Sequence, residues 1–358
     1  MEGINWEKTK ERLGALWENE IVDRCCIAIP MSQGPGDYEV ITQMSSNWSE
    51  KEIIKGYIDT DFITQQARKK FSKTKYFGDA LPCIFPNFGT AGYVQYIGSK
   101  PTYRADTIWL SKTLTEPDAS QIVFDETIYM EHLKHVKELV DLAKNEYLIT
   151  MPDNCGIIDG LAAIRGSDSL LFDFIEEPEF IERATRKLIE IQRKTIPGFF
   201  ETIKKNNDGG SSHAWMHLWS PKRVVQVQCD FSVMISPDDY KRFVVPELEA
   251  TAEWADYAVY HLDGQEQIRH LDYILSVDVI KMIQWTPVAG QPPASDFIPV
   301  FQKIQSAGKG LVLILQAWEV EKVITELSSK GLHMIVNDVH SEKEAMEILR
   351  LVEQKTHC

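Results

Sequence analysis

The sequence has 358 residues, of which 44% are hydrophobic and 25% are charged, as in an ordinary folded protein. Its formal net charge of −15 argues against binding to nucleic acid or anionic membrane surfaces, and against a polyanionic substrate. The six cysteines form no CxxC pair, so neither a zinc ribbon nor a disulfide framework is expected. There is no apolar run of about 18 residues and no signal-peptide pattern at the start, so we expect a cytoplasmic protein.

The first third of the chain reads irregularly. The spacing of apolar residues predicts an amphipathic helix over Trp6–Glu18, and an apolar run predicts a strand over Cys25–Pro30. A loop follows at Ser32–Gly36, and aromatic, glycine and proline residues crowd Phe77–Trp109. We interpret residues 1–125 as the first strand of the fold followed by a long segment that covers one face.

From Glu131 onward, short apolar runs alternate with helical stretches at the spacing of βαβ units. The strands expected here are Tyr147–Met151, His213–Leu218, Ala258–His261, Ile280–Trp285, Leu311–Leu315 and His333–Asn337. The helices expected are Ile158–Ile175, Glu179–Lys205, Pro237–Ala255, Glu266–Leu275, Asp296–Ala307, Glu319–Ser328 and Ser341–Glu353. Ser236 and Ser341, each followed by acidic residues, are predicted to cap the N-termini of two of these helices.

These elements predict an α/β fold of the (β/α)8, or TIM-barrel, type. Eight strands result when Cys25–Pro30 and Val224–Cys229 join the six above, and we expect a single domain over residues 1–358, with regular βα units over 126–358. An open doubly wound sheet is the alternative. However, no GxGxxG or GxxxxGK[ST] motif follows any expected strand, so the phosphate-binding signs of that alternative are missing.

In such barrels the reacting groups lie at the carboxyl ends of the strands, where the βα loops converge. We predict catalytic roles for His261, Asp263, Asp338 and His340. We predict substrate-binding roles for Asp153, Asn154, His217, Trp219, Gln284, Trp285, Gln316 and Trp318. Structural alternatives stay open, because Asp153-Asn154 could be a helix cap or turn, His217 a core histidine, and the tryptophans plugs of the barrel mouth.

The segment His261-Leu262-Asp263-Gly264 gives the strongest functional signal. Alternation along a strand puts His261 and Asp263 on one side, and Gly264 allows the chain to turn sharply. Imidazole and carboxylate are both zinc ligands, and a carboxylate can also orient a histidine. We therefore predict a metal site, most simply zinc, that includes His261, Asp263 and Asp338.

Other kinds of chemistry have less support in the sequence. The tryptophans near strand ends, Trp215, Trp219, Trp285 and Trp318, could stack on a sugar, an aromatic ring or a methylated cation. Nucleophilic catalysis is not favoured, because there is no Gly-x-Ser-x-Gly motif and no cysteine with an evident neighbouring base.

Several stretches resemble the uroporphyrinogen decarboxylase superfamily, which includes corrinoid-linked methyltransferases. The stretches that carry the resemblance are Ile21–Arg24, Phe77–Ala80, Cys229–Pro237, Phe243–Leu248 and Tyr260–Gly264. They follow the order of the family and extend over nearly the whole chain. The resemblance implies a barrel enzyme and is less specific for the reaction.

The sequence departs from both main branches of that superfamily. In the decarboxylase branch, arginines near the first strand hold the carboxylates of the substrate. The corresponding loop in this sequence, Met31–Gly36, contains no arginine. Methylcobamide:coenzyme M methyltransferases use a His-x-Cys pair and a distant cysteine to bind zinc. Here Asp263 stands where the first cysteine would be, and Val336–His340 contains none. An oxygen and nitrogen site that includes Asp338 and His340 would be more Lewis acidic.

From the resemblance we expect a corrinoid-dependent methyltransferase or O-demethylase that acts on a small methylated or methoxylated compound. A corrinoid protein would be the partner that accepts the methyl group. Two alternatives remain: a metal-dependent or acid/base lyase, isomerase or decarboxylase acting on a sugar or small hydroxy acid, and a non-catalytic binding protein with the same fold.

Overall fold

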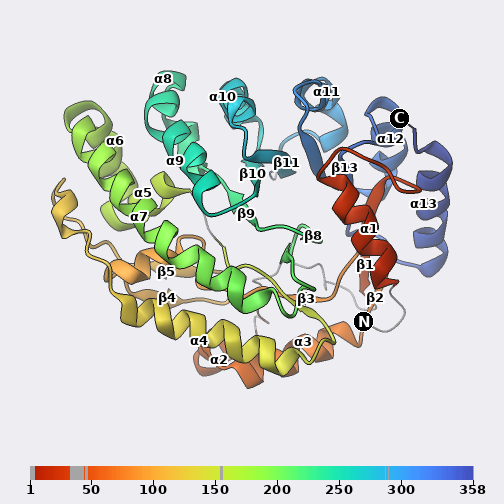
Figure 1. Cartoon of the computed structure of the whole chain (residues 1–358), viewed down its shortest axis with the longest axis horizontal. Coiled ribbons are helices and arrows are strands. Elements are labelled where there is room, and N and C mark those ends of the chain that lie inside the picture. Colours follow the sequence, from red (N-terminus) through yellow and green to blue (C-terminus); the bar gives the residue numbers. More distant parts are fainter. Residues whose placement is uncertain are drawn as a thin grey trace.

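The computed structural model describes residues 5–32, 44, 47–153, 156–286, 288 and 290–357. It is an α/β structure in which helices form the periphery and most strands lie toward the middle (Figure 1). Among the described residues, no helix has both the length and the apolar character needed to cross a bilayer.

The main sheet has seven strands in the order β2-β1-β13-β12-β11-β10-β9. All neighbours in it are parallel except β1 and β2, which are antiparallel. The bounds of these strands are β1 (Cys26–Ser32), β2 (Thr74–Gly78), β9 (Val224–Val227), β10 (Tyr257–Asp263), β11 (Ile280–Thr286), β12 (Gly310–Leu315) and β13 (Leu332–Val336). The short pairs are β3 (Cys83–Ile84) with β6 (Leu148–Ile149), β4 (Pro101–Tyr103) with β5 (Ile108–Leu110), and β7 (Ser211–His213) with β8 (Leu218–Ser220).

The closed barrel of eight strands is not confirmed, because the main sheet is open with β2 and β9 at its edges. The strands that would complete a barrel are only two or three residues long. Isolated backbone hydrogen bonds join the segments around these short strands. One of them runs from Met151 N, after β6, to Ser212 O in β7, at 3.1 Å. The fold shown is thus a mostly parallel sheet with helices around it.

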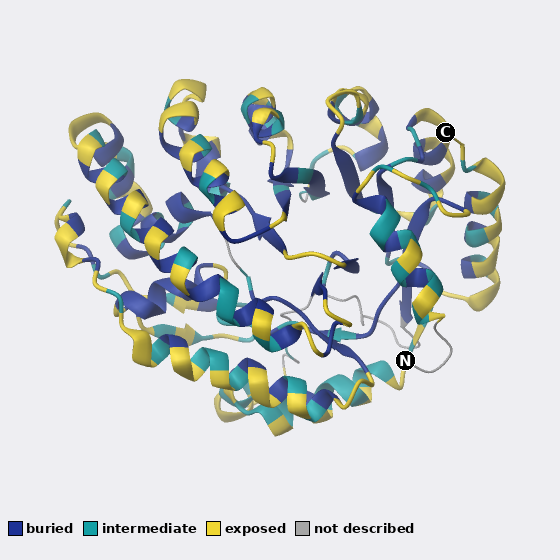
Figure 2. Ribbon diagram, in the orientation of Figure 1, coloured by how far each residue is buried: buried dark blue, intermediate teal, exposed yellow. Residues whose placement is uncertain are grey.

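Most of the helices surround the outer side of the sheet, whereas α1 precedes the first strand and packs with the inner-face residues. Their bounds are α1 (Trp6–Leu16), α2 (Glu50–Ile58), α3 (Thr60–Phe71), α4 (Glu126–Ala143), α5 (Ile157–Arg165), α6 (Ser167–Glu176), α7 (Pro178–Ile203), α8 (Pro237–Asp239), α9 (Val245–Ala250), α10 (Leu271–Ser276), α11 (Ile298–Ser306), α12 (Val320–Glu326) and α13 (Glu342–Lys355). Figure 2 shows that the strands are mostly buried and that the exposed residues lie on the outer sides of these helices.

Two clusters of buried apolar side chains pack on the two faces of the sheet. The inner cluster contains Ala28, Val224, Val259, Met282 and Val312 from the strands, together with Leu13 and Leu16 of α1 and Trp17 just after it. The outer cluster contains the alternate strand residues and side chains of the surrounding helices. Successive residues of a strand point to opposite faces of the sheet. Membership of the inner or the outer cluster therefore shows which face each strand residue occupies.

Most of the expected elements are confirmed with small shifts at their ends. Strands β1, β9, β10, β11, β12 and β13 and helices α1, α7, α11, α12 and α13 lie where the apolar patterns predict them. Both predicted serine caps are confirmed as well: Ser236 Oγ accepts a hydrogen bond from Asp239 N at 3.1 Å, and Ser341 Oγ accepts one from Glu344 N at 3.2 Å.

Four expectations were wrong in detail. The strand expected over His213–Leu218 is a turn between β7 and β8, with His217 in the left-handed region at φ 46°. The helix expected over Ile158–Ile175 divides at Gly166, whose φ of 90° ends α5. The helix expected over Pro237–Ala255 is interrupted between α8 and α9 by a π-helical turn. The irregular N-terminal third contains α2 and α3, which were not expected.

Candidate functional site

The candidate site lies at the carboxyl ends of β9, β10 and β11, on the inner face of the sheet. On β10, alternation from the inner residue Val259 places His261 and Asp263 on this face. Residues Gln284 and Thr286 of β11 pair in register with His261 and Asp263. Asp230 begins the short 3-10 helix that follows β9. Side chains from three separate segments therefore meet at one edge of the sheet.

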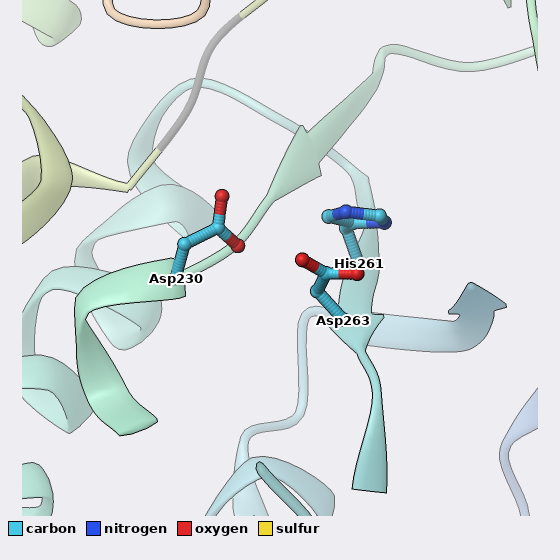
Figure 3. Close-up of side chains that lie close together, drawn as sticks. All are labelled: Asp230, His261 and Asp263. Atoms are coloured by element: carbon cyan, nitrogen blue, oxygen red, sulfur yellow. The ribbon is translucent and has the colours of Figure 1, made fainter. Parts of the chain in front are cut away.

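Asp230, His261 and Asp263 form a compact group (Figure 3). One ligand-type atom from each residue lies within 4.8 Å of the other two, and all three side chains are half-buried. In the described part of the chain no other three histidine, cysteine or acidic residues meet in this way. Sequence reasoning brought His261 and Asp263 together, but it missed Asp230. The position of Asp230 just after the apolar run that forms β9 was the signal that could have found it.

The ring of His261 is oriented by Gln284. Gln284 Nε2 donates to the carbonyl oxygen of Trp285 at 2.6 Å, so its Oε1 is the atom that faces His261 Nδ1. Since Oε1 can only accept, Nδ1 must carry the proton and donate it to Gln284. This leaves Nε2 of a neutral His261 with a lone pair, which is the arrangement found in metal-binding histidines whose other nitrogen donates to an oxygen.

Asp230 is held through one carboxylate oxygen. Gln228 Nε2 donates to Asp230 Oδ2 at 2.7 Å, while Oδ1 is buried and has no hydrogen-bond partner among the described residues. Burial and then the neighbouring carboxylate of Asp263 raise the pKa of Asp230, while the charge of His261 and the side-chain amides of Gln228 and Gln267 act in the lowering direction. A cation beside these groups would relieve both the burial of charge and the repulsion between carboxylates.

Two more buried acids lie behind Asp230. Asp159 accepts hydrogen bonds from the backbone N–H groups of Asp230 at 3.0 Å and Phe231 at 2.8 Å. Glu247 accepts from Ile157 N and Ile158 N at the first turn of α5, at 3.2 and 3.0 Å.

Both of these acids hold their protons more tightly than usual. Burial, followed by the charge of Asp230, raises the pKa of Asp159 to about 7. Burial and then Asp159 raise the pKa of Glu247. Asp159 therefore fixes the backbone at Asp230, although burial and the nearby charge of Asp230 disfavour the charged form of Asp159.

Trp215 forms an aromatic edge beside the group. Its ring meets the ring of His261 edge-on, with centroids 5.4 Å apart, and it meets the ring of His213 in the same way at 5.3 Å. Trp215 is half-buried, whereas His213 is 3% exposed. The aromatic residue at the site is thus one of the four tryptophans considered from the sequence, but not one of those predicted to bind substrate.

The predicted residues near β12 and β13 lie apart from this group. Asp338 Oδ1 accepts a hydrogen bond from Ala317 N at 2.9 Å, and the group of possible metal ligands contains Asp230 rather than Asp338. His340 is exposed and its backbone N–H donates to Glu344 at 3.0 Å. Gln316 and Trp318 are also exposed, the latter by 65%.

Three other predicted residues are buried among core side chains. His217 Nδ1 accepts a hydrogen bond from Leu81 N at 3.1 Å, and Trp219 Nε1 donates to Asn207 O at 2.9 Å. Trp285 belongs to the outer cluster, where it packs against Phe297 and Phe301, because alternation turns it away from Gln284. Their surroundings are those of packed structural residues.

Asp153 lies elsewhere again. It lines a small cavity together with Phe88, Tyr93 and Thr195. Asn154, predicted with it, is outside the described residues.

The three site residues fit a divalent cation that takes nitrogen and oxygen ligands. The group offers one neutral imidazole and two carboxylates, with Asp230 Oδ1 unpaired within the described structure. Zinc is commonly bound by such a set with a further position for water or substrate. Among the described residues no cysteine belongs to this group, and Cys229, next to Asp230, is buried in the outer cluster.

Comparison with known proteins gives a likeness among solved structures. No protein-family model matches the chain, and no curated protein matches it either. Among solved structures, the chain is similar to a methyltransferase from Methanosarcina mazei, with a TM-score of 0.57 over 97% of this chain and 98% of that one. The two sequences are 11% identical, so the likeness shows a shared fold, and the resemblance to the uroporphyrinogen decarboxylase superfamily stays a prediction.

Proposed function

We propose that this chain is a methyltransferase that removes the methyl group of a small methylated or methoxylated compound and passes it to a corrinoid carried by a partner protein. The observation that carries the proposal is the meeting of Asp230, His261 and Asp263 at a strand-end edge. The fold shared with a methyltransferase supports the choice of reaction. Zinc is the metal we propose for the site.

The chain's own residues would supply position and charge. His261, fixed by Gln284, would present Nε2, and the two carboxylates would provide the negative charge that holds a cation. When bound, the ion would act as a Lewis acid on the atom from which the methyl group leaves. The methyl group would pass to reduced cobalt, and the donor atom would keep the bonding electron pair. Trp215 would limit how the donor lies beside His261.

Asp230 favours a second candidate function. Burial raises the pKa of the Asp230 carboxyl group above its usual value, which is the direction in which general acids are tuned. With His261 as its neighbour, it could serve a lyase or decarboxylase acting on a small hydroxylated acid without any metal. This reaction would survive treatment with a chelator, whereas methyl transfer assisted by zinc would not.

The test combines metal analysis with an assay of cobalt methylation. Purified protein, Asp230→Ala, Asp263→Ala and the matched control Asp338→Ala are loaded with zinc, desalted and analysed for bound metal. We expect the control to retain zinc and both site variants to lose it. Full occupancy in the site variants would contradict the metal site.

The second arm follows methyl-cobalt formation by absorbance, with methoxylated donors and a corrinoid protein. We expect methylation with the wild type and with Asp338→Ala, and none with the site variants. If no donor in a broad panel methylates cobalt, the acid/base reaction becomes the better proposal.

A further inference from the structure

A surface cleft lies between α2, α4 and the β4–β5 pair, apart from the candidate site. Its volume is about 560 Å³, within the range of roughly 300–1,000 Å³ that is usual for small-molecule pockets. None of its described lining residues belongs to the group of Asp230, His261 and Asp263. In Figure 1, α2 and α4 lie along the lower edge of the molecule, whereas β10 and β11 lie in its upper half. A ligand in this cleft would therefore occupy a second site.

One side of α4 forms a wall of the cleft. Its lining residues recur at the helical spacing of three or four residues, which keeps them on one side of the helix. They include Ile128, Glu131, His132, His135 and Glu138. The two glutamates are exposed, whereas the isoleucine and the two histidines are half-buried. The wall thus presents carboxylates toward the solvent and alkyl and imidazole groups deeper in.

Aromatic rings form much of the remaining lining. The ring of Phe88 stacks on that of His132, with centroids 3.8 Å apart, and meets the ring of His135 edge-on at 5.5 Å. On the side of α2 and β4, the ring centroids of Tyr57 and Tyr103 are 5.3 Å apart. All of these rings line the cleft. The face of an aromatic ring attracts a cation, so this lining favours a positively charged ligand.

The two histidines of the lining are uncharged at neutral pH. Burial and then His135 lower the pKa of His132 to about 4. Burial also lowers the pKa of His135, against the raising influence of Glu138. The imidazole rings therefore act as neutral aromatic surfaces and do not repel a cation.

The charged groups of the lining leave one carboxylate without a counterion. Glu138 pairs with Lys134 at 3.7 Å. Glu131 makes no ion pair with any residue that the structure describes. The other polar residues that line the cleft, Asn87 and Gln95, are uncharged. The net charge of −15 on the whole chain also favours the approach of cations.

We propose that this cleft binds an organic monocation, namely an ammonium group attached to an apolar body. The ammonium would lie beside Glu131, and the apolar body would cover Phe88 and the rings next to it. An anion would be repelled by the unpaired carboxylate, and a neutral molecule of the same shape would gain only from the apolar and aromatic surface. The site is independent of the proposed methyl transfer, because it shares no residue with the group at the strand ends.

The experiment compares ligands that have the same apolar body and differ in charge. Ligand-observed NMR titrations at neutral pH would use 2-phenylethylamine as the cation, 2-phenylethanol as the neutral analogue and 3-phenylpropionate as the anion. Low ionic strength keeps the screening of exposed charges small. We expect the wild type to bind the amine about fivefold more tightly than the alcohol, and the propionate most weakly.

Two pairs of variants locate the bound amine. Glu131→Gln removes the unpaired carboxylate, and its control Asp141→Asn removes an exposed carboxylate of α4 that lies outside the cleft. Ile58→Lys adds a cation on the α2 side of the cleft, and its control Met130→Lys adds one on α4 outside it. Ile58 and Met130 are 53% and 50% exposed, so both positions tolerate a lysine. We expect both cleft variants to lose the preference for the amine and both controls to keep it within about twofold.

Three outcomes overturn the site. The first is a wild-type protein that does not prefer the amine to both analogues. The second is a preference that persists in either Glu131→Gln or Ile58→Lys, which would place the amine elsewhere. The third is an equal loss in the control variants, which would reduce the effect to the net charge of the chain. Failure of cobalt methylation would remove the proposed methyl transfer and leave this site standing.

Discussion

Strands β10 and β12 are both central parallel strands of the same sheet, yet their inner faces end differently. On β10, Val259 is followed by His261 and Asp263, while on β12, Val312 is followed by Ile314 and the chain then leaves for the surface at Gln316. Polar chemistry is thus concentrated at one part of the strand-end edge. The other part was equally rich in polar residues in the sequence.

The carboxylates of the two regions also have different partners. Near β12 and β13, Asp338 accepts from Ala317 N, and Glu319 accepts from Ser295 N and Gln316 N, each at 2.8 Å. In the candidate site Asp230 keeps one buried oxygen unpaired within the described chain. A strand-end acid that accepts hydrogen bonds from backbone amides of another segment holds loops in place. An acid with an unpaired oxygen is the better candidate for binding a ligand.

The largest difference is expected between two histidines. His261→Ala should lower kcat/KM for methyl transfer by about a thousandfold or more, because a ligand and its oriented lone pair are lost. His340→Ala, at the exposed end after β13, should stay within about twofold of the wild type. Steady-state kinetics with a methoxylated donor and corrinoid protein measure both. Equal losses in the two variants would erase the distinction between the regions.

The second largest effect is expected on the pH dependence of stability, through Asp159 behind the candidate site. The pKa of Asp159 is raised to about 7 in the folded protein, above its usual value of 3.8. The folded state therefore binds the proton more tightly, and this stabilisation is complete below about pH 4 and lost as pH rises through 7. In metal-free protein, the loss of unfolding free energy between low and neutral pH should be smaller in Asp159→Asn than in the wild type, by on the order of 2 kcal/mol. Urea unfolding between pH 4 and pH 8 measures it, and an unchanged slope would contradict the assignment.

Removing the group that orients His261 should have a smaller effect. Gln284→Leu keeps the approximate size of the side chain but cannot accept the proton of His261 Nδ1. We expect zinc affinity to fall by about 10- to 100-fold, as with other partners of metal-binding histidines. Competition with a chromophoric chelator gives the affinity. Wild-type affinity in Gln284→Leu would mean that the ring is held by other contacts.

The smallest effect is expected at β13. Asp338→Ala removes the hydrogen bond to Ala317 N and should lower the free energy of unfolding by about 1 kcal/mol. Zinc affinity should not change, because Asp338 is outside the ligand group. Denaturant titration and the chelator assay together test the assignment. A loss of zinc affinity here would return Asp338 to the metal site, as the sequence alone suggested.

The sequence by itself determined the type and order of most elements. Alternating apolar strands and amphipathic helices depend on local periodicity, which is written in the chain. The same periodicity put His261 and Asp263 on one face, and the structure agrees. It could also have separated Gln284 from Trp285, since neighbouring strand residues point to opposite faces.

The tertiary structure decided which strand ends meet. Asp230 joins His261 only because β9 pairs with β10, and that pairing is a long-range contact that no local pattern specifies. Asp338 is separated from them because its carboxylate caps a neighbouring loop at Ala317. Residue type and spacing thus predicted that acids and histidines would lie at strand ends. Strand pairing and hydrogen bonding to backbone amides determined which of them form a site.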